Sequence, residues 1–275
     1  MTADPRDILE RREIEAYWTW AERLADRARQ IFRHHDGNCR DVESKYDGSP
    51  ITTLDRRIEE MWRAEVGATF PEHGVLGEEF PPTNPTASWQ WIFDPIDGTE
   101  EFIHRLPFFG CILALHYQGN PVVAVIDHPM LDRRCSAAYA RGTIENGRRV
   151  TLSRAVPHSA AVRPRLVLPA RCDFSRHATS VQLFDRLVSE YPNFRVFRTC
   201  YGHTCAATGR VDATLEFDVA PWDLAATRLL VEEAGGCYQP LAGPGLADVD
   251  RQSAVFGHAE VVGKLADIYA EWAAA

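Results

Sequence analysis

The feature that most limits how this chain can fold is a change in its pattern near residue 153. Before it, short runs rich in β-branched and aromatic residues follow one another with Gly or Pro breaks, which is typical of antiparallel strands. We expect strands at Val75–Phe80, Trp89–Ile96, Phe108–Tyr117, Val122–His128 and Arg134–Ala140, with a hairpin turn at Asn146-Gly147. After it, strands and helices alternate, which indicates an α/β half. The 275 residues allow one structural unit built from halves 1–153 and 154–275.

Helical periodicity predicts the remaining elements. A first amphipathic helix is expected at Ile8–Phe32, and Thr52 and Thr53 offer N-cap hydroxyls to a second. The second half is expected to contain the strand Leu166–Leu168, helix Ser175–Tyr191, strand Phe194–Arg198, helix Gly202–Thr208, strand Asp212–Phe217, helix Leu224–Ala234 and helix His258–Ala274.

Charge and composition exclude several classes of protein. The chain has 30 basic and 39 acidic residues, a net charge of −9, and no block of Lys and Arg, which argues against a nucleic-acid-binding surface. It has no apolar run of the roughly 18 residues that span a membrane and no secretory signal at its start, so we expect a cytoplasmic protein. The seven cysteines never form C-x-x-C, which predicts reduced thiols rather than a zinc site or disulfides.

The segment Trp91–Thr99 carries the strongest chemical signal. An apolar run ends in Asp94 and Asp97, which would repel each other unless a cation lies between them. Oxygen ligands favour a hard ion such as Mg²⁺ or Mn²⁺ over zinc. Gly98 permits a tight turn, so the amides of Gly98 and Thr99 can face an anion. An ordinary surface turn would use the same residue types.

Other polar residues are ambiguous when they are taken singly. The pair Glu78-Glu79 is compatible with two solvated side chains, and Glu216 is compatible with a solvated residue at a strand end. Asp223 is compatible with a helix N-cap, and Asp55 is compatible with a solvated residue at the start of a helix. Five histidines show no spacing typical of metal ligands, so we expect none of them to bind a metal: His34, His35, His73, His116 and His203.

The order of these motifs resembles that of the inositol monophosphatase family of metal-dependent phosphatases. The matching segments are Gly77-Glu78-Glu79, Asp94-Pro95-Ile96-Asp97-Gly98-Thr99, Trp222-Asp223 and Glu233–Gly236, with further similarity at 47–55 and 209–212. Together they cover nearly the whole chain. The resemblance implies the family's α/β fold, a layered α-β-α-β-α sandwich with two sheets and a site between them.

The resemblance also implies roles for individual residues. Two or three Mg²⁺ ions, with Mn²⁺ as a substitute, are expected to bind the side chains of Glu78, Asp94, Asp97 and Asp223 and the carbonyl of Ile96. Glu79 would lie beside these ligands. Asp55 and Thr99 match the pair that holds the attacking water, and the amides of Gly98 and Thr99 would bind phosphate oxygens.

The sequence says less about the leaving group of the substrate than about the metal ligands. Glu216 matches the family's glutamate that contacts the leaving group, and Cys200-Tyr201 resembles the histidinol-phosphatase branch. Proteins of that branch usually have Asp at the position of Thr199 in this chain. We expect Thr199 to lie beside the substrate. Glu100 and Glu101 add negative charge next to the phosphate site, with His104 and Arg105 as the nearest basic residues in sequence.

We therefore expect a phosphomonoesterase acting on a small phosphate ester, with histidinol phosphate and inositol monophosphate as leading substrates. The alternatives are a nucleotide 3′-phosphatase, a sugar bisphosphatase, or a non-catalytic member that binds a partner. Members of the family are commonly homodimers, which leaves a homodimer open here.

Overall fold

The computed structural model describes residues 4–34, 42–45, 50–152, 164–176, 180–242 and 251–274. Its larger sheet has seven strands in the order β3-β4-β5-β6-β7-β8-β9. They are β3 (Gly74–Gly77), β4 (Trp89–Asp97), β5 (Gly110–Tyr117), β6 (Asn120–His128), β7 (Arg133–Ala138), β8 (Gly142–Glu145) and β9 (Arg148–Val150). β3 and β4 are parallel, and the other neighbours are antiparallel, which confirms the strand-rich first half. Asn146 and Gly147 have positive φ angles of 46° and 78° in the predicted hairpin turn.

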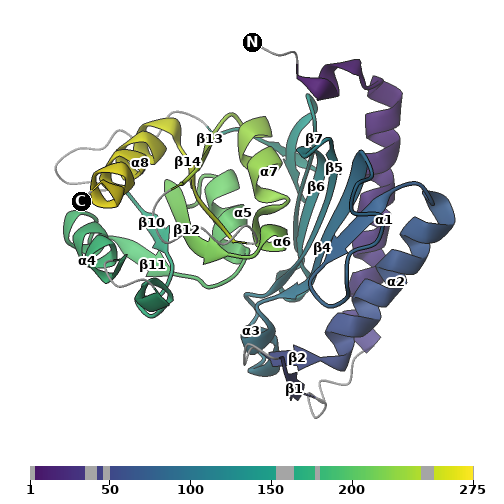
Figure 1. Ribbon diagram of the computed structural model, residues 1–275, viewed down its shortest axis with the longest axis horizontal. Helices are drawn as coiled ribbons and strands as arrows, with labels where there is room; N and C mark the ends of the chain where they lie inside the picture. The colour runs from purple at the N-terminus through teal and green to yellow at the C-terminus, as the bar shows by residue number, and fades with distance from the viewer. Residues whose placement is uncertain are drawn as a thin grey trace.

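Two long helices, α1 (Arg11–His34) and α2 (Thr53–Thr69), cover one face of this sheet (Figure 1). Side chains of a strand alternate between its two faces. Trp91 and Phe93 of β4 therefore pack into the core formed with α1 and α2, whereas Ile92 packs toward the opposite side. Asp94 continues this alternation on the side of Ile92. The alternation of side chains along β4 thus directs Asp94 away from α1 and α2 and toward the middle of the molecule.

The second sheet has five strands in the order β11-β10-β12-β14-β13. They are β10 (Leu166–Leu168), β11 (Phe194–Val196), β12 (Ala213–Val219), β13 (Cys237–Pro240) and β14 (Gln252–Gly257). β10 is parallel to both neighbours, and β14 is antiparallel to both of its neighbours. The sequence analysis did not predict β13 and β14, nor the small pair β1 (Val42–Ser44) and β2 (Pro50–Thr52).

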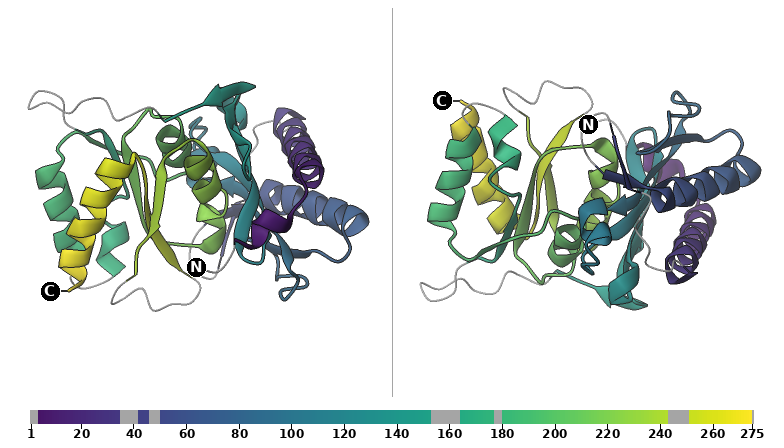
Figure 2. Two further views of the ribbon diagram at one scale, coloured as in Figure 1. Left: turned by 90° about the horizontal axis from the view of Figure 1, so that it is seen from above. Right: turned by 90° about the horizontal axis from the view of Figure 1, so that it is seen from below.

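Helices fill the space between the sheets and cover the far side of the second one. The middle layer contains α5 (Tyr201–Ala207), α6 (Pro221–Leu224) and α7 (Thr227–Glu233), and the outer layer contains α4 (Ser180–Glu190) and α8 (Ala259–Ala273). The same layers appear from above and below in Figure 2. The predicted α-β-α-β-α sandwich is confirmed. Shorter helices are η1 (Pro5–Ile8), α3 (Thr99–Ile103), η2 (Pro129–Leu131) and η3 (Asp173–Arg176).

Two helix predictions need correction. The helix expected at Ser175–Tyr191 is a short 3-10 helix, η3, followed by α4, and residues 177–179 between them lie outside the described part. The helix expected at Leu224–Ala234 begins earlier and is divided into α6 and α7, so Asp223 lies inside α6 rather than before a helix. The boundary at residue 153 also lies outside the described residues. Within the described residues, no helix is long and apolar enough to cross a membrane.

Candidate active site

A bulge at the end of β4 brings its two aspartates to one side. In the pairing of β4 with β5, Asp94 lies opposite Ile112 and Asp97 lies opposite Gly110, so β4 has one residue more than its partner. Such an extra residue changes the direction of the side chains that follow it. Without it, residues three apart on a strand would point to opposite faces. The bulge therefore allows Asp94 and Asp97 to face the same space.

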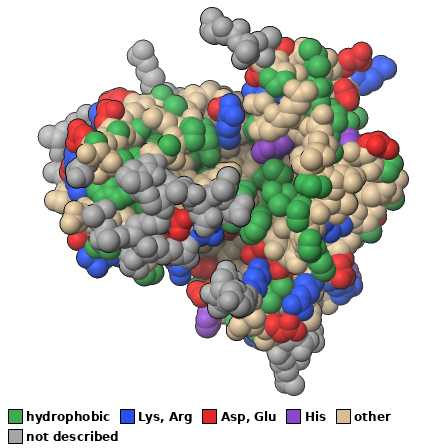
Figure 3. Space-filling view, viewed as in Figure 1, with side chains coloured by type: hydrophobic (Ala, Val, Ile, Leu, Met, Phe, Trp, Pro, Cys, Tyr) green, Lys and Arg blue, Asp and Glu red, His purple; other side chains and the backbone are tan. Residues whose placement is uncertain are grey.

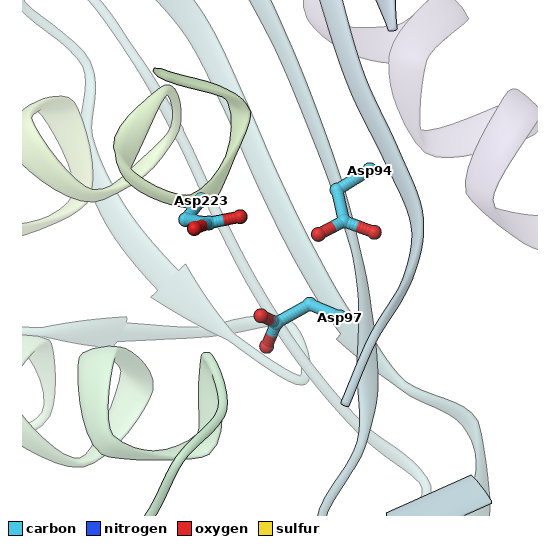
Figure 4. A group of neighbouring side chains, drawn as sticks. All are labelled: Asp94, Asp97 and Asp223. Carbon is cyan, nitrogen blue, oxygen red and sulfur yellow. The ribbon is translucent and has the colours of Figure 1, made fainter. Parts of the chain in front are cut away.

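Asp223 joins the two aspartates from the other side of the site. In α6 its carboxylate accepts a hydrogen bond of 2.9 Å from the backbone N–H of Ala220 at the start of the helix. Carboxylate oxygens of Asp94, Asp97 and Asp223 lie within 4.8 Å of one another. Figure 4 shows the three side chains pointing toward a common space, two from β4 and one from α6. The structure thus brings together three of the predicted metal ligands, although Asp97 and Asp223 are 126 positions apart in the sequence.

The electrostatics of this group favour a bound cation. Burial raises the pKa of Asp94 well above its ordinary value, and the neighbouring carboxylates raise it further. The pKa of Asp223 is raised for the same two reasons. Burial also raises the pKa of Asp97 to about 6, against the opposing effect of the His203 imidazole. Oδ1 of Asp94 is buried and has no hydrogen-bond partner within the described residues. A set made only of oxygen donors suits Mg²⁺, so these residues fit such an ion.

Glu78 and Glu79 are not the solvated pair that their sequence alone suggested. The side chain of Glu79 is only 1% exposed and that of Glu78 is 20% exposed. Lys45 Nζ lies 2.5 Å from Glu78 Oε1 and 2.9 Å from Glu79 Oε1. Burial and the charge of Glu78 raise the pKa of Glu79 to about 7, although Lys45 opposes this. The sequence analysis did not single out Lys45, and residues 46–49 beside it lie outside the described part.

Glu59 of α2 also supports the two glutamates, and the sequence analysis missed it. It has no exposed surface, its Oε2 accepts a 2.8 Å hydrogen bond from the Glu79 backbone N–H, and its Oε1 accepts one from Arg63. Gly77 makes room for it, because a Cβ at that position would lie 2.1 Å from Glu59 Oε1. A charged residue on an amphipathic helix carries no signal for such a contact.

Asp55 is buried at the start of α2. Thr52 and Asp55 form a capping box, in which Asp55 Oδ2 accepts hydrogen bonds of 2.8 Å from Thr52 N and 2.5 Å from Thr52 Oγ1. Its other oxygen, Oδ1, has no partner within the described residues. Burial raises the pKa of Asp55 to about 6, despite these hydrogen bonds. Thr99 Oγ1 donates to the Ile96 carbonyl at 3.2 Å, and no direct hydrogen bond joins Thr99 to Asp55 among the described residues.

The turn after β4 depends on glycine. Gly98 has a φ of 94°, and a Cβ there would lie 2.6 Å from Thr199 Cγ2. Thr199 Oγ1 donates a 2.5 Å hydrogen bond to the Phe108 carbonyl and accepts one of 3.3 Å from the Tyr201 backbone N–H. Arg198 Nη1 lies 3.8 Å from Glu100 Oε2 and supplies a nearby positive charge, whereas both His104 and Arg105 are exposed.

A cavity of about 150 Å³ is lined in part by Asp223, one of the three aspartates. Its charged lining residues are Asp173, Arg198, Glu216, Asp218, Asp223 and Arg251. Glu216 is 8% exposed and its Oε1 lies 3.2 Å from His203 Nε2, so it is not a solvated residue at a strand end. Figure 3 shows the surface hollowed between the two halves of the molecule. The cavity and the candidate metal site thus share Asp223.

Comparison with known proteins agrees with this arrangement. A sequence model described as the inositol monophosphatase family matches residues 10–270. A histidinol-phosphatase of Chlorobaculum parvum is 35% identical over 78% of this chain and 82% of its own length. One from Mycobacterium tuberculosis is 35% identical over 80% of this chain and 85% of its own length. The solved structure of an IMPase from Thermotoga maritima shares the fold, with a TM-score of 0.79 over 94% of this chain and 98% of that chain at 23% identity.

Proposed function

Since this chain belongs to the inositol monophosphatase family and is a phosphoric monoester hydrolase, we propose that it releases phosphate from a small monoester with a cationic amino-alcohol leaving group. Histidinol phosphate is the first candidate substrate, and inositol monophosphate is the second. The observation that carries this proposal is the group Asp94, Asp97 and Asp223, whose member Asp223 also lines a cavity together with Glu216.

The lining of the cavity supports a cationic leaving group. Four carboxylates, Asp173, Glu216, Asp218 and Asp223, line it together with two guanidinium groups, Arg198 and Arg251. Arg198 pairs with Asp173 at 2.9 Å and Arg251 with Asp218 at 3.4 Å, and within the described residues no Lys or Arg pairs with Glu216, whose partner is the His203 imidazole. An ammonium or imidazolium group would add a charge-assisted hydrogen bond to Glu216, whereas a neutral polyol would add a weaker one. The cavity therefore favours the amino alcohol even though Thr199 replaces a carboxylate.

The proposed metal ligands are Glu78, Asp94, Asp97, Asp223 and the carbonyl of Ile96, which would hold two or three Mg²⁺ ions, with Mn²⁺ as a substitute. Bound Mg²⁺ supplies positive charge that stabilises the transferring phosphoryl group and makes water a better nucleophile. Every donor in this set is an oxygen, and three of them already face one space.

The remaining residues prepare the reactants. Asp55, whose buried Oδ1 has no hydrogen-bond partner among the described residues, would orient a water and accept its proton, and the Thr99 hydroxyl would hold the same water. The amides of Gly98 and Thr99, at the start of α3, would bind the phosphate oxygens. Glu79, whose Oε1 accepts a 2.9 Å hydrogen bond from Lys45 beside Glu78, would assist catalysis from next to the metal ligands.

Phosphate release from a panel of esters tests the proposal. The panel contains histidinol phosphate, inositol 1-phosphate, fructose 1,6-bisphosphate, adenosine 3′,5′-bisphosphate and p-nitrophenyl phosphate. We expect the highest kcat/KM for histidinol phosphate. A preference for either bisphosphate would favour the alternative branches, and no Mg²⁺-dependent release from any ester would favour a non-catalytic protein.

The substitution Glu216→Gln tests whether Glu216 contacts the leaving group of the substrate. Loss of a charged hydrogen bond costs about 1.5–3 kcal/mol, so the ratio of kcat/KM for histidinol phosphate to that for p-nitrophenyl phosphate should fall roughly 10- to 150-fold. Glu190→Gln, which removes the same charge from the exposed outer helix α4, is the matched control. An unchanged ratio in Glu216→Gln would remove Glu216 from the substrate site. The cytoplasmic location and the homodimer stay predictions, which cell fractionation and light scattering would test.

A further inference from the structure

A buried histidine links the proposed leaving-group residue to the middle layer of helices. His203 on α5 lies between Glu216 on β12 and Thr227 on α7. Its Nε2 is 3.2 Å from Glu216 Oε1, and its Nδ1 is 2.9 Å from Thr227 Oγ1. His203 is 3% exposed, Thr227 is fully buried and Glu216 is 8% exposed. The imidazole also packs edge-on against the ring of Phe256, with ring centres 5.2 Å apart.

The donor and acceptor properties of Thr227, His203 and Glu216 fix the direction of the two hydrogen bonds that join them. A carboxylate only accepts hydrogen bonds, so Nε2 of His203 must carry the proton and donate to Glu216. In the neutral imidazole, Nδ1 is then an acceptor, and the Thr227 hydroxyl donates to it. Because the threonine hydroxyl satisfies Nδ1, it favours the tautomer that leaves the proton on Nε2. The order of donation is therefore Thr227 to His203 to Glu216.

We propose that His203, held by Thr227, is a positioning residue that fixes the Glu216 carboxylate as an acceptor for the leaving group of the substrate. A glutamate has several rotamers, and ordering it on substrate binding opposes affinity. A hydrogen bond from a buried ring restricts the carboxylate before substrate arrives. Glu216 also lines the cavity, so its carboxylate is held at the edge of the space that the leaving group would enter. This inference rests on the proposed function, because the position of Glu216 matters only when the cavity receives a leaving group.

Two substitutions of His203 separate the hydrogen bond from the space that the ring fills. His203→Leu removes the donor, whereas His203→Gln offers an amide N–H close to the position of Nε2. We expect His203→Leu to lower the ratio of kcat/KM for histidinol phosphate to that for p-nitrophenyl phosphate about tenfold, the scale of one hydrogen bond. His203→Gln should restore most of that ratio. A purely structural role would lower the rates for both substrates together and leave their ratio unchanged.

Thr227→Val provides a milder test that preserves side-chain volume. It removes the hydroxyl that selects the tautomer and leaves His203 and Glu216 in place. We expect the substrate ratio to fall in the same direction, by less than in His203→Leu. This variant keeps the inference falsifiable if His203→Leu does not fold, since an unchanged ratio in a folded Thr227→Val protein would contradict the role of the tautomer.

A double-mutant cycle with Glu216→Gln decides whether His203 acts through Glu216. If it does, His203→Leu should lower the ratio no further in the Glu216→Gln background. Additive losses would overturn the inference, as would an unchanged ratio in both His203→Leu and Thr227→Val. Failure of the proposed function looks different: the wild-type protein would then show no preference for histidinol phosphate or would release no phosphate at all, which refutes both. Wild-type preference combined with unaffected variants refutes the positioning role alone.

Discussion

Substitution of Asp55 by asparagine should make the protein a worse enzyme and, at neutral pH, a more stable one. The Asp55 side chain has no exposed surface, and burial raises its pKa from 3.8 to about 6. An ionised carboxylate in that position therefore destabilises the folded state. A pKa raised by about two, at ~1.4 kcal/mol for each pKa unit, corresponds to about 3 kcal/mol. Asparagine carries no charge and keeps an oxygen that can accept the capping hydrogen bond from Thr52.

The sign of the pH dependence follows from linkage. Below pH 4, Asp55 is protonated in both the folded and the unfolded state, so it contributes no electrostatic penalty. As the pH rises from about 4 to 6, the unfolded chain ionises first and the folded state loses stability. Above the folded pKa the full penalty is present. The free energy of unfolding of Asp55→Asn minus that of the wild type should therefore increase by about 3 kcal/mol between pH 4 and pH 8.

Urea unfolding of both proteins at several pH values, in the presence of a chelator, measures this difference. Glu60→Gln, on the exposed side of the same helix, is the control and should show no comparable trend. Phosphate release at pH 7.5 with saturating Mg²⁺ gives the second readout, and Asp55→Asn should lose at least the roughly 10²-fold that general-base catalysis contributes. A stability difference that does not change with pH would refute the buried ionised carboxylate. Wild-type turnover would refute its role toward the attacking water.

Three further predictions concern the metal site and the turn beside it. Asp94→Asn and Asp223→Asn should each lower kcat by more than the roughly 10- to 100-fold typical of a residue beside a metal ligand. Both should stabilise the chelated protein and abolish the rise in Tm on adding Mg²⁺, and near wild-type turnover in either would refute the ligand assignment. Activity should require Mg²⁺, be partly supported by Mn²⁺ and be inhibited by Ca²⁺, because Ca²⁺ forms longer bonds in looser geometry; phosphate release in excess chelator would contradict this. Gly98→Ala should destabilise the fold by about 1–3 kcal/mol in urea unfolding, because it adds a clash with Thr199 to an unfavourable φ. Gly119→Ala, at a φ of 77° in open space, should cost less, and equal losses would show that the contact is irrelevant.

Local sequence was sufficient to predict a structural feature where the residues that produce the feature lie within one short segment. The Asn146-Gly147 turn follows from two residues that tolerate positive φ, and Thr52 with Asp55 forms its capping box within four residues. The limits of β4 follow from its apolar run and from the aspartates that end it. Periodicity failed at Leu224–Ala234, since an apolar pattern does not reveal that the backbone breaks between α6 and α7.

The residues that the sequence analysis misread or missed act over long distances along the chain. Lys45 reaches glutamates 33 and 34 positions away, and Glu59 holds the backbone of Glu79. Lysine and glutamate are common on exposed surfaces, so their types alone cannot predict burial.

The amino-acid sequence by itself determined the family, the layered fold and the identity of the acidic residues, because these depend on local patterns and on the order of motifs. Only the tertiary structure decided which of those residues meet. The bulge in β4 turns Asp97 toward Asp94, and the packing of α6 between two sheets brings Asp223 to them. The contact between His203 and Glu216 likewise depends on how α5 packs against β12. Electrostatic interactions and hydrogen bonds depend on distance in space, and separation along the chain does not fix that distance.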